Sequence, residues 1–166
     1  MSIENLNNND AKEKLKELAE GIDFCFMATQ LGGNPAHAIP MSTKEVCDQG
    51  NIWFLSNKDS QHNQNIKVNP HTELYYGKPG SMEFLTVFGE ATISTDRTTI
   101  DRLYGKADDN WFDGKDDPNV TVIKVTPKDA HYWEPKSNAL ISLVKMGVGY
   151  VTGKKQELGD EGDLNL

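Results

Sequence analysis

The stretch from residue 55 to residue 62 combines side chains that can hold an anion with a sequence that starts a helix. Ser60 is a favourable helix N-cap, and the first turn of a helix presents unpaired backbone N–H groups and a positive dipole end. Ser56 adds a hydroxyl, Lys58 a fixed positive charge, and His62 an imidazole that can become charged. This spacing predicts a phosphate cradle, although a capped helix with solvated polar residues would show the same pattern.

A second candidate is the segment Ile39-Pro40-Met41-Ser42-Thr43, which lies inside a strand pattern. Proline has no backbone N–H, so it is found at strand edges or bulges where the ladder is interrupted. Backbone groups freed there can hydrogen-bond a planar heterocycle. An edge strand protected from aggregation explains the same proline more simply.

Aromatic pairs at Trp111-Phe112 and Tyr132-Trp133 could supply apolar walls for such a ring, although most aromatic residues simply fill a core. The four histidines have no metal-ligand spacing, and the chain lacks nucleophile-elbow, P-loop and dinucleotide-binding motifs. The acidic pairs at 108–109 and 116–117 are interpreted as solvated loop carboxylates. The sequence therefore predicts no metal site and identifies no general acid or base.

Charge and composition narrow the function classes. The 166 residues fit one domain, and 25 acidic against 17 basic side chains give a net charge of −8. An acidic surface repels nucleic acid and anionic membranes, but it can still contain one small basic pocket. With no secretory leader and no apolar run of about 20 residues, we expect a cytoplasmic protein in which Cys25 and Cys47 are free thiols.

The elements that must position these residues are short strands and short helices. Apolar periodicity and turn signals predict helices at 9–22, 60–68, 96–104 and 138–146, and strands at 24–29, 36–46, 52–56, 72–76, 82–94, 120–125 and 130–133. Six or so strands in meander order favour a mainly β protein, a closed or nearly closed antiparallel barrel. We expect a single domain over 1–166, with an N-terminal helix in 1–22 and a polar tail at 147–166 that frays unless it docks on a partner.

Several short motifs, in order, resemble the general stress protein subgroup of the pyridoxamine-phosphate-oxidase-like family. The likeness covers nearly the whole chain, and its specificity lies in the order and spacing of the motifs, which are Gly33-Asn34-Pro35, Pro40 to Val46, Gly50 to Phe54, Asn57 to Ser60, Asn69-Pro70, Gly89-Glu90-Ala91, Trp111-Phe112, Gly114 to Pro118, Lys124 to Pro127, Tyr132-Trp133-Glu134 and Val151 to Lys155.

The resemblance implies a split β-barrel that forms a homodimer and binds flavin mononucleotide (FMN) at the dimer interface. It places Pro40, Met41 and Ser42, together with Leu55, Ser56 and Asn57, along the ring and ribityl chain. It assigns the phosphate to Ser60 and His62, with Lys58 nearby, and takes Trp133 and Trp111 from the partner subunit.

Two positions depart from the family pattern. Ile39 stands where the family often has arginine, and His62 stands where it often has lysine. A charge-assisted hydrogen bond contributes roughly 1.5–3 kcal/mol, so FMN occupancy depends on replacement by Lys58, Lys67 or a partner residue. If His62 contacts the phosphate with an ordinary pKa near ~6.5, FMN affinity should rise as the pH falls from 8 to 6.

Three functions follow from the resemblance. The first is an FMN-dependent oxidoreductase of unknown substrate and reductant. The second is a non-catalytic flavin-binding or sensing module, and the third is a split-barrel dimer that has lost FMN. Pyridoxal phosphate synthesis is not expected, because Glu134-Pro135-Lys136-Ser137 follows Trp133 where the vitamin-forming oxidases carry an arginine-and-histidine pair.

Overall fold

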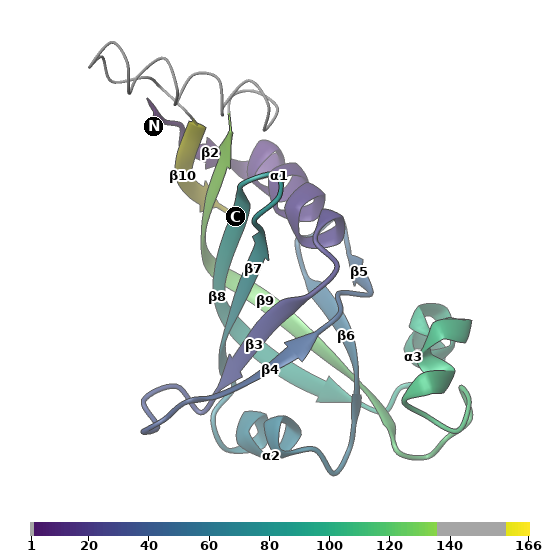
Figure 1. Cartoon of the computed structure of the whole chain (residues 1–166). Coiled ribbons are helices and arrows are strands. Elements are labelled where there is room, and N and C mark those ends of the chain that lie inside the picture. Colours follow the sequence, from purple (N-terminus) through teal and green to yellow (C-terminus); the bar gives the residue numbers. More distant parts are fainter. Residues whose placement is uncertain (1, 136–158) are drawn as a thin grey trace.

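The computed structural model describes residues 2–135 and 159–166, and it is a mainly β structure (Figure 1). Six antiparallel strands form the barrel wall in the order β6-β9-β8-β7-β3-β4, and they are β3 (Cys25–Thr29), β4 (His37–Met41), β6 (Ile52–Asn57), β7 (His71–Lys78), β8 (Glu83–Ser94) and β9 (Val120–Pro135). In the described part of the chain no ladder joins β4 to β6, so the barrel is split between these two strands. The predicted split barrel is therefore confirmed.

The predicted strand at 36–46 is interrupted. Its first part forms β4 at the sheet edge, as the proline in this strand indicated, and its last two residues form β5 (Glu45–Val46), which pairs with β6. Residues 42–44 between them belong to neither strand. The interruption leaves this short connection at the opening between β4 and β6.

Strand β9 is one continuous element where the sequence predicted two. Pro127 lies inside it, opposite Gly89 of β8, at a register shift between Phe88 and Gly89. A Cβ atom at Gly89 would lie 2.5 Å from the carbonyl oxygen of Thr126, so only glycine lets the two strands approach this closely. The bulge absorbs the proline without ending the strand.

The polar tail forms a strand with its own chain. β10 (Gly159–Asn165) pairs antiparallel with the second half of β9 and parallel with β1 (Ser2–Ile3) and β2 (Leu6–Asn7). The expectation that the tail frays unless it docks on a partner is therefore wrong for these residues. Leu164, which is 2% exposed, anchors β10 in the main core.

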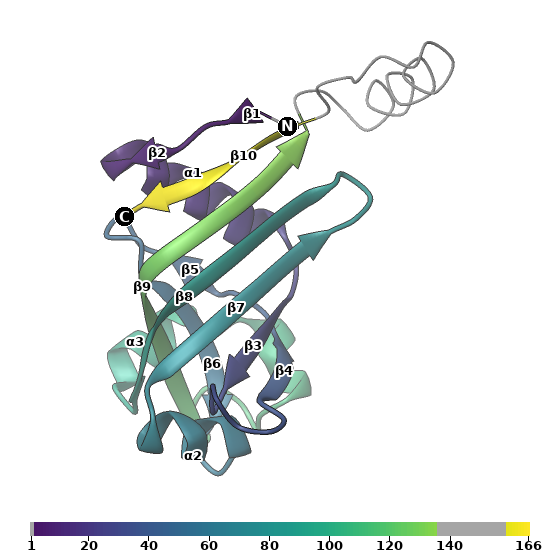
Figure 2. The same cartoon turned by 90° about the vertical axis from the view of Figure 1, so that its left-hand side faces the viewer.

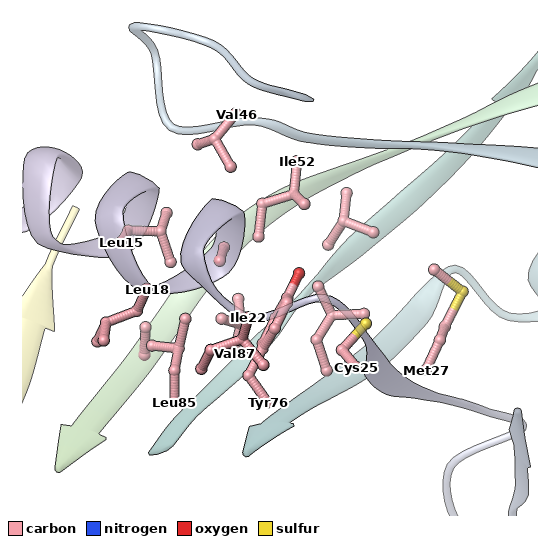
Figure 3. Close-up of a cluster of buried hydrophobic side chains, with 14 of the residues drawn as sticks. Leu15, Leu18, Ile22, Cys25, Met27, Val46, Ile52, Tyr76, Leu85 and Val87 are labelled. Carbon is pink, nitrogen blue, oxygen red and sulfur yellow. The ribbon is translucent and has the colours of Figure 1, made fainter. Parts of the chain in front are cut away.

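Helix α1 (Asn8–Gly21) covers the inner face of the sheet, and Figure 2 shows it behind β10, β9, β8 and β7. Its buried side chains, including Leu15 and Leu18, point toward Tyr76, Leu85 and Val87 of the sheet (Figure 3). The helix begins at Asn8, one residue before the predicted start at position 9. This packing of an amphipathic helix against a sheet forms the main core.

The remaining helices are short and lie away from α1. Helix α2 (Gln61–Val68) closes the end of the barrel opposite α1, and α3 (Arg97–Leu103) packs on β9 through a second cluster that includes Leu55, Ile100 and Val122. A 3-10 turn, η1 (Lys106–Asn110), follows α3. The helix predicted at 138–146 lies outside the described residues. Within residues 2–135 and 159–166 no helix has the length and apolar character needed to cross a bilayer.

Candidate functional site

The split between β4 and β6 holds a pocket of about 260 Å³. Its walls come from both edge strands, from the connection after β4, from the start of α2 and from the segment after α3. The lining residues are Phe24, Pro40, Met41, Ser42, Lys44, Leu55, Ser56, Asn57, His62, Asp108, Trp111 and Phe112. Because β4 and β6 do not pair with each other, the pocket follows directly from the topology of the barrel.

The end of this pocket nearest α2 is a cluster of hydroxyl and imidazole groups. The Nε2 atom of His62 lies 2.6 Å from Oγ of Ser56 and 3.1 Å from Oγ of Ser60, within hydrogen-bond distance of both. Ser60 also caps α2, because its hydroxyl accepts a hydrogen bond from the backbone N–H of Asn63. The predicted N-cap is thus confirmed, and the helix that begins after it contributes His62 to the pocket wall.

A buried polar network fixes this cluster to the barrel. Ser56 donates a hydrogen bond to Oδ1 of Asn63 at 3.0 Å, and the Asn63 amide donates to Oγ1 of Thr121 at 3.0 Å. Thr121 in turn donates to the backbone carbonyl of Ser56 at 3.1 Å. Asn63 and Thr121 are almost fully buried, so breaking this ring would leave polar groups without partners. The network holds the first turn of α2 against β6 and β9.

His62 is neutral at physiological pH in this structure. Only 8% of the residue is exposed, and burial, together with the charge of nearby His37, lowers the pKa of His62 to about 4. The expectation of an ordinary pKa near 6.5 is therefore wrong. Because His62 stays uncharged from pH 8 to 6, its own titration gives no reason for the FMN affinity to rise over that range.

Two other residues of the pocket wall form an ion pair. The ammonium group of Lys44, in the connection after β4, lies 2.8 Å from Oδ2 and 3.1 Å from Oδ1 of Asp108 in η1. Asp108 also accepts a hydrogen bond from the backbone N–H of Gly105 at 2.8 Å. The carboxylate therefore ties the segment that carries Trp111 and Phe112 to the pocket wall.

Two acidic side chains interpreted as solvated are in fact structural. Asp108 forms the ion pair just described, and its side chain is 14% exposed. Asp117 is 8% exposed and accepts hydrogen bonds from the backbone N–H groups of Asp113 and Asn119. These bonds, with a smaller contribution from the charge of Lys58, lower the pKa of Asp117. The prediction failed because local sequence does not show which loop carboxylates receive donors from the backbone.

The structure brings together most of the predicted site residues. Eight of them line the pocket, namely Pro40, Met41, Ser42, Leu55, Ser56, Asn57, His62 and Trp111. Trp111 lines the pocket of its own chain, whereas the resemblance took it from the partner subunit. Ser60 contacts the pocket through His62. Ile39 packs against the main core, and Lys58 is exposed in the turn before α2. Phe24, Lys44 and Asp108 were not predicted, and no local motif marks them.

Trp133 lies on another part of the molecule. It belongs to β9, where it pairs in register with Phe84 of β8, and its ring packs edge-on against His131 at a centroid distance of 4.4 Å. His131 also bonds Asp163 of β10, with Nδ1 2.7 Å from Oδ1. Trp133 is not among the residues that line the pocket of its own chain.

Four aromatic side chains are exposed on β3, β7 and β8 and just before β3. Phe24, Phe26, Tyr75 and Phe84 are 62%, 58%, 44% and 37% exposed, and we call these four residues the aromatic face. Phe26 pairs with Tyr75 across β3 and β7, and Phe24 also lines the pocket. The pocket therefore lies at one edge of the aromatic face.

Comparison with known proteins gives a consistent result. A model of the family described as "Pyridoxamine 5'-phosphate oxidase like" matches residues 10–157. General stress protein 26 of Bacillus subtilis is 27% identical over 141 residues, which cover 83% of this chain and 99% of that protein. Protein bli-3 of Neurospora crassa is 27% identical over 112 residues, which cover 62% of this chain and 54% of that protein.

Solved structures share the fold. A Jannaschia sp. CCS1 protein assigned to general stress protein 26 superimposes with a TM-score of 0.77 at 22% identity, covering 95% of this chain and 98% of that one. The general stress FMN/FAD binding protein of Xanthomonas citri gives a TM-score of 0.67 at 23% identity, covering 79% of this chain and 93% of that one.

Proposed function

This chain belongs to the pyridoxamine 5'-phosphate oxidase-like family, and from that premise we propose that it is a flavin-binding protein whose pocket between β4 and β6 takes FMN. The observation that carries the proposal is the convergence of eight predicted site residues on this one pocket. The Xanthomonas citri protein of the same fold, described as FMN/FAD binding, supports the ligand class.

The side chains present fit a flavin. Apolar groups from Phe24, Pro40, Leu55 and Phe112 can pack on a flat ring, while the hydroxyl and imidazole groups at the start of α2 can hydrogen-bond a polyol chain. A bound flavin would supply the redox chemistry by accepting and passing on electrons. The residues of this chain would hold the ring, orient it and keep water from it.

The proposal includes a homodimer in which the aromatic face meets a second copy. Aromatic residues are enriched at protein interfaces, and exposed apolar patches of several hundred Å² mark contact sites. Four side chains of ~150–250 Å² each, about half exposed, give roughly 400 Å², or about half of the ~800 Å² that each partner buries in a standard interface. The pocket of about 260 Å³ is also smaller than the ~300–1,000 Å³ typical of ligand sites, and in the proposed dimer a second subunit would extend its walls.

Trp133 is the residue that we expect the second subunit to contribute to the pocket. It lies on β9, on the same outer face of the sheet as Phe84, and it is remote from the pocket of its own chain. A second copy packed face to face could therefore bring it to the pocket mouth. A Phe26→Asp substitution puts a charge in the middle of the aromatic face and should produce a monomer in analytical ultracentrifugation, with weaker FMN binding. A variant that stays dimeric would contradict this interface.

Within this proposal the protein is an FMN-dependent oxidoreductase rather than a passive flavin carrier. The test is the visible absorption spectrum of the purified protein before and after FMN is added and the excess removed. Retained flavin bands that NADH or NADPH then bleaches support an oxidoreductase. Retained bands that neither reductant bleaches favour the flavin-binding or sensing module, and a protein that stays colourless after reconstitution contradicts flavin binding.

We also place the protein in the cytoplasm, supported by the free thiols of Cys25 and Cys47.

A further inference from the structure

The end of the pocket at the start of α2 offers hydrogen bonds but no fixed positive charge. Its polar groups are the hydroxyls of Ser56 and Ser60 and the neutral imidazole of His62. Ile39, which stands where the family often has arginine, packs its side chain against the main core. Among the described residues that line the pocket, Lys44 is the only lysine or arginine.

The nearby lysines either interact with carboxylates or lie far from this end of the pocket. Lys44 is bonded to both carboxylate oxygens of Asp108, and the charge of Lys58 acts on the carboxylate of Asp117. Lys67 lies in the last turn of α2, about 9 Å along the helix axis from its first turn at ~1.5 Å per residue. Replacement of the missing cations by Lys58 or Lys67 within one chain is therefore not supported by the geometry.

From this arrangement we infer that the pocket recognises a flavin by its ring and ribityl chain rather than by its phosphate, so that riboflavin binds within about tenfold of FMN at pH 8. The inference rests on the proposed flavin site and specifies its ligand more closely. Ser60 and neutral His62 can each both donate and accept hydrogen bonds, and Ser56, which donates its hydroxyl hydrogen to Asn63, can accept one. These groups suit the hydroxyl groups of a polyol as well as a phosphate ester.

The expected contributions to affinity favour weak discrimination between FMN and riboflavin. A fixed cation bonded to a phosphate oxygen is worth roughly 10- to 100-fold in affinity, and this end of the pocket provides none. The positive end of the α2 dipole remains, and it is worth roughly two- to fivefold. The chain carries a net charge of −8, which adds long-range repulsion toward a phosphate dianion. The balance leaves at most a small preference for FMN.

Protonation of His62 could in principle restore the missing charge, but its surroundings oppose it. The imidazole is buried, it contacts neutral groups from β6 and α2, and His37 of β4 acts on it as a like charge when protonated. No carboxylate of the described residues is among its hydrogen-bond partners. At pH 8 the pocket should therefore behave as a neutral site.

The test is the dissociation constants of riboflavin and FMN for the full-length protein at pH 8, measured by quenching of flavin fluorescence. Constants within tenfold of each other support the inference. FMN binding more than tenfold tighter overturns it, and that outcome would indicate a cation supplied by the partner subunit. If neither flavin binds, the proposed function itself fails, which is a separate result.

A charge substitution gives an independent test. His62→Lys should increase the ratio of the riboflavin to the FMN dissociation constant at least tenfold at pH 8, because it puts a cation where the phosphate would lie. The control is His71→Lys, the same change at an exposed histidine on β7 outside the pocket, and it should alter neither constant. Equal effects of the two variants on FMN binding would overturn the inference.

Should His62→Lys fail to fold, inorganic phosphate serves as a probe of the wild-type protein. Phosphate, compared with chloride at the same ionic strength, should leave the dissociation constants of both flavins unchanged. Weakening of FMN binding alone would reveal a dedicated phosphate subsite and would contradict the inference.

Discussion

The buried imidazole of His62 should make stability fall below pH 6.5 in a way that one substitution removes. Its pKa is about 4 in the folded protein against an ordinary value of 6.5, so between these values the unfolded chain binds the proton and the folded protein does not. Stability therefore rises with pH through this window. The contribution is fully present above about pH 6.5, falls as the pH drops toward 4, and does not change further below that.

The magnitude follows from the two pKa values. Between pH 8 and pH 5 the expected loss is RT ln[(1 + 10^1.5)/(1 + 10^−1)], where the exponents are 6.5 − 5 and 4 − 5, and this equals about 2 kcal/mol. His62 is only 8% exposed, so solvent screening should reduce this value little. An effect of this size is a sizeable fraction of the ~5–15 kcal/mol stability of a typical domain.

The assay is urea unfolding at pH 8, 7, 6 and 5 and at one protein concentration, because an oligomer would otherwise change the apparent stability. Wild type and His62→Gln share the titration of all carboxylates, so their difference in unfolding free energy isolates His62. This difference should shift by about 2 kcal/mol in favour of the variant between pH 8 and pH 5. His71→Gln, at an exposed histidine, is the control. Parallel curves for wild type and His62→Gln would refute the reasoning.

Three further changes test the scaffold around the site. Lys44→Met and Asp108→Asn, combined in a double-mutant cycle by urea unfolding, should give a coupling energy of about 1 kcal/mol, because the ion pair is half-buried. An absence of coupling would mean that the ion pair does not hold the segment that carries Trp111 and Phe112. Gly89→Ala should lower the unfolding free energy by about 1–3 kcal/mol, because its Cβ would meet the Thr126 carbonyl, and a neutral result would show that the bulge can open. Leu164→Ala should cost about 2–5 kcal/mol and speed proteolysis of β10, and unchanged cleavage would argue against its anchoring role.

The sequence predicted the site best where residues close together in the sequence determine the local structure. The cap at Ser60 and the proline after Asn69 define α2, and Pro40 marks the unpaired edge of the barrel. These features depend on neighbours in sequence, so a single chain reveals them. The same is true of the hairpin strands on either side of the turn at Gly50.

The sequence predictions were wrong where residues far apart in the sequence determine the structure. Lys44 and Asp108 are 64 positions apart, and only the fold shows that they form an ion pair. The pKa of His62 depends on burial and on His37, neither of which can be inferred from the residues beside it. The continuity of β9 depends on the missing side chain of Gly89 on another strand. In each case tertiary contacts override what the local sequence indicates.

The pairing of the two ends of the chain has a consequence for how the protein is made. Strands β1 and β2 have β10 as their ladder partner, and the hydrogen bond from the backbone N–H of Asp163 to Asn5 joins residues 158 positions apart. Loop closure over such a separation is entropically costly and slows folding. On the ribosome β1 and β2 can therefore form their ladders with β10 only after residues 159–165 have emerged from the exit tunnel. The split of the barrel and its pocket, which use residues 24–125, can form before that final closure.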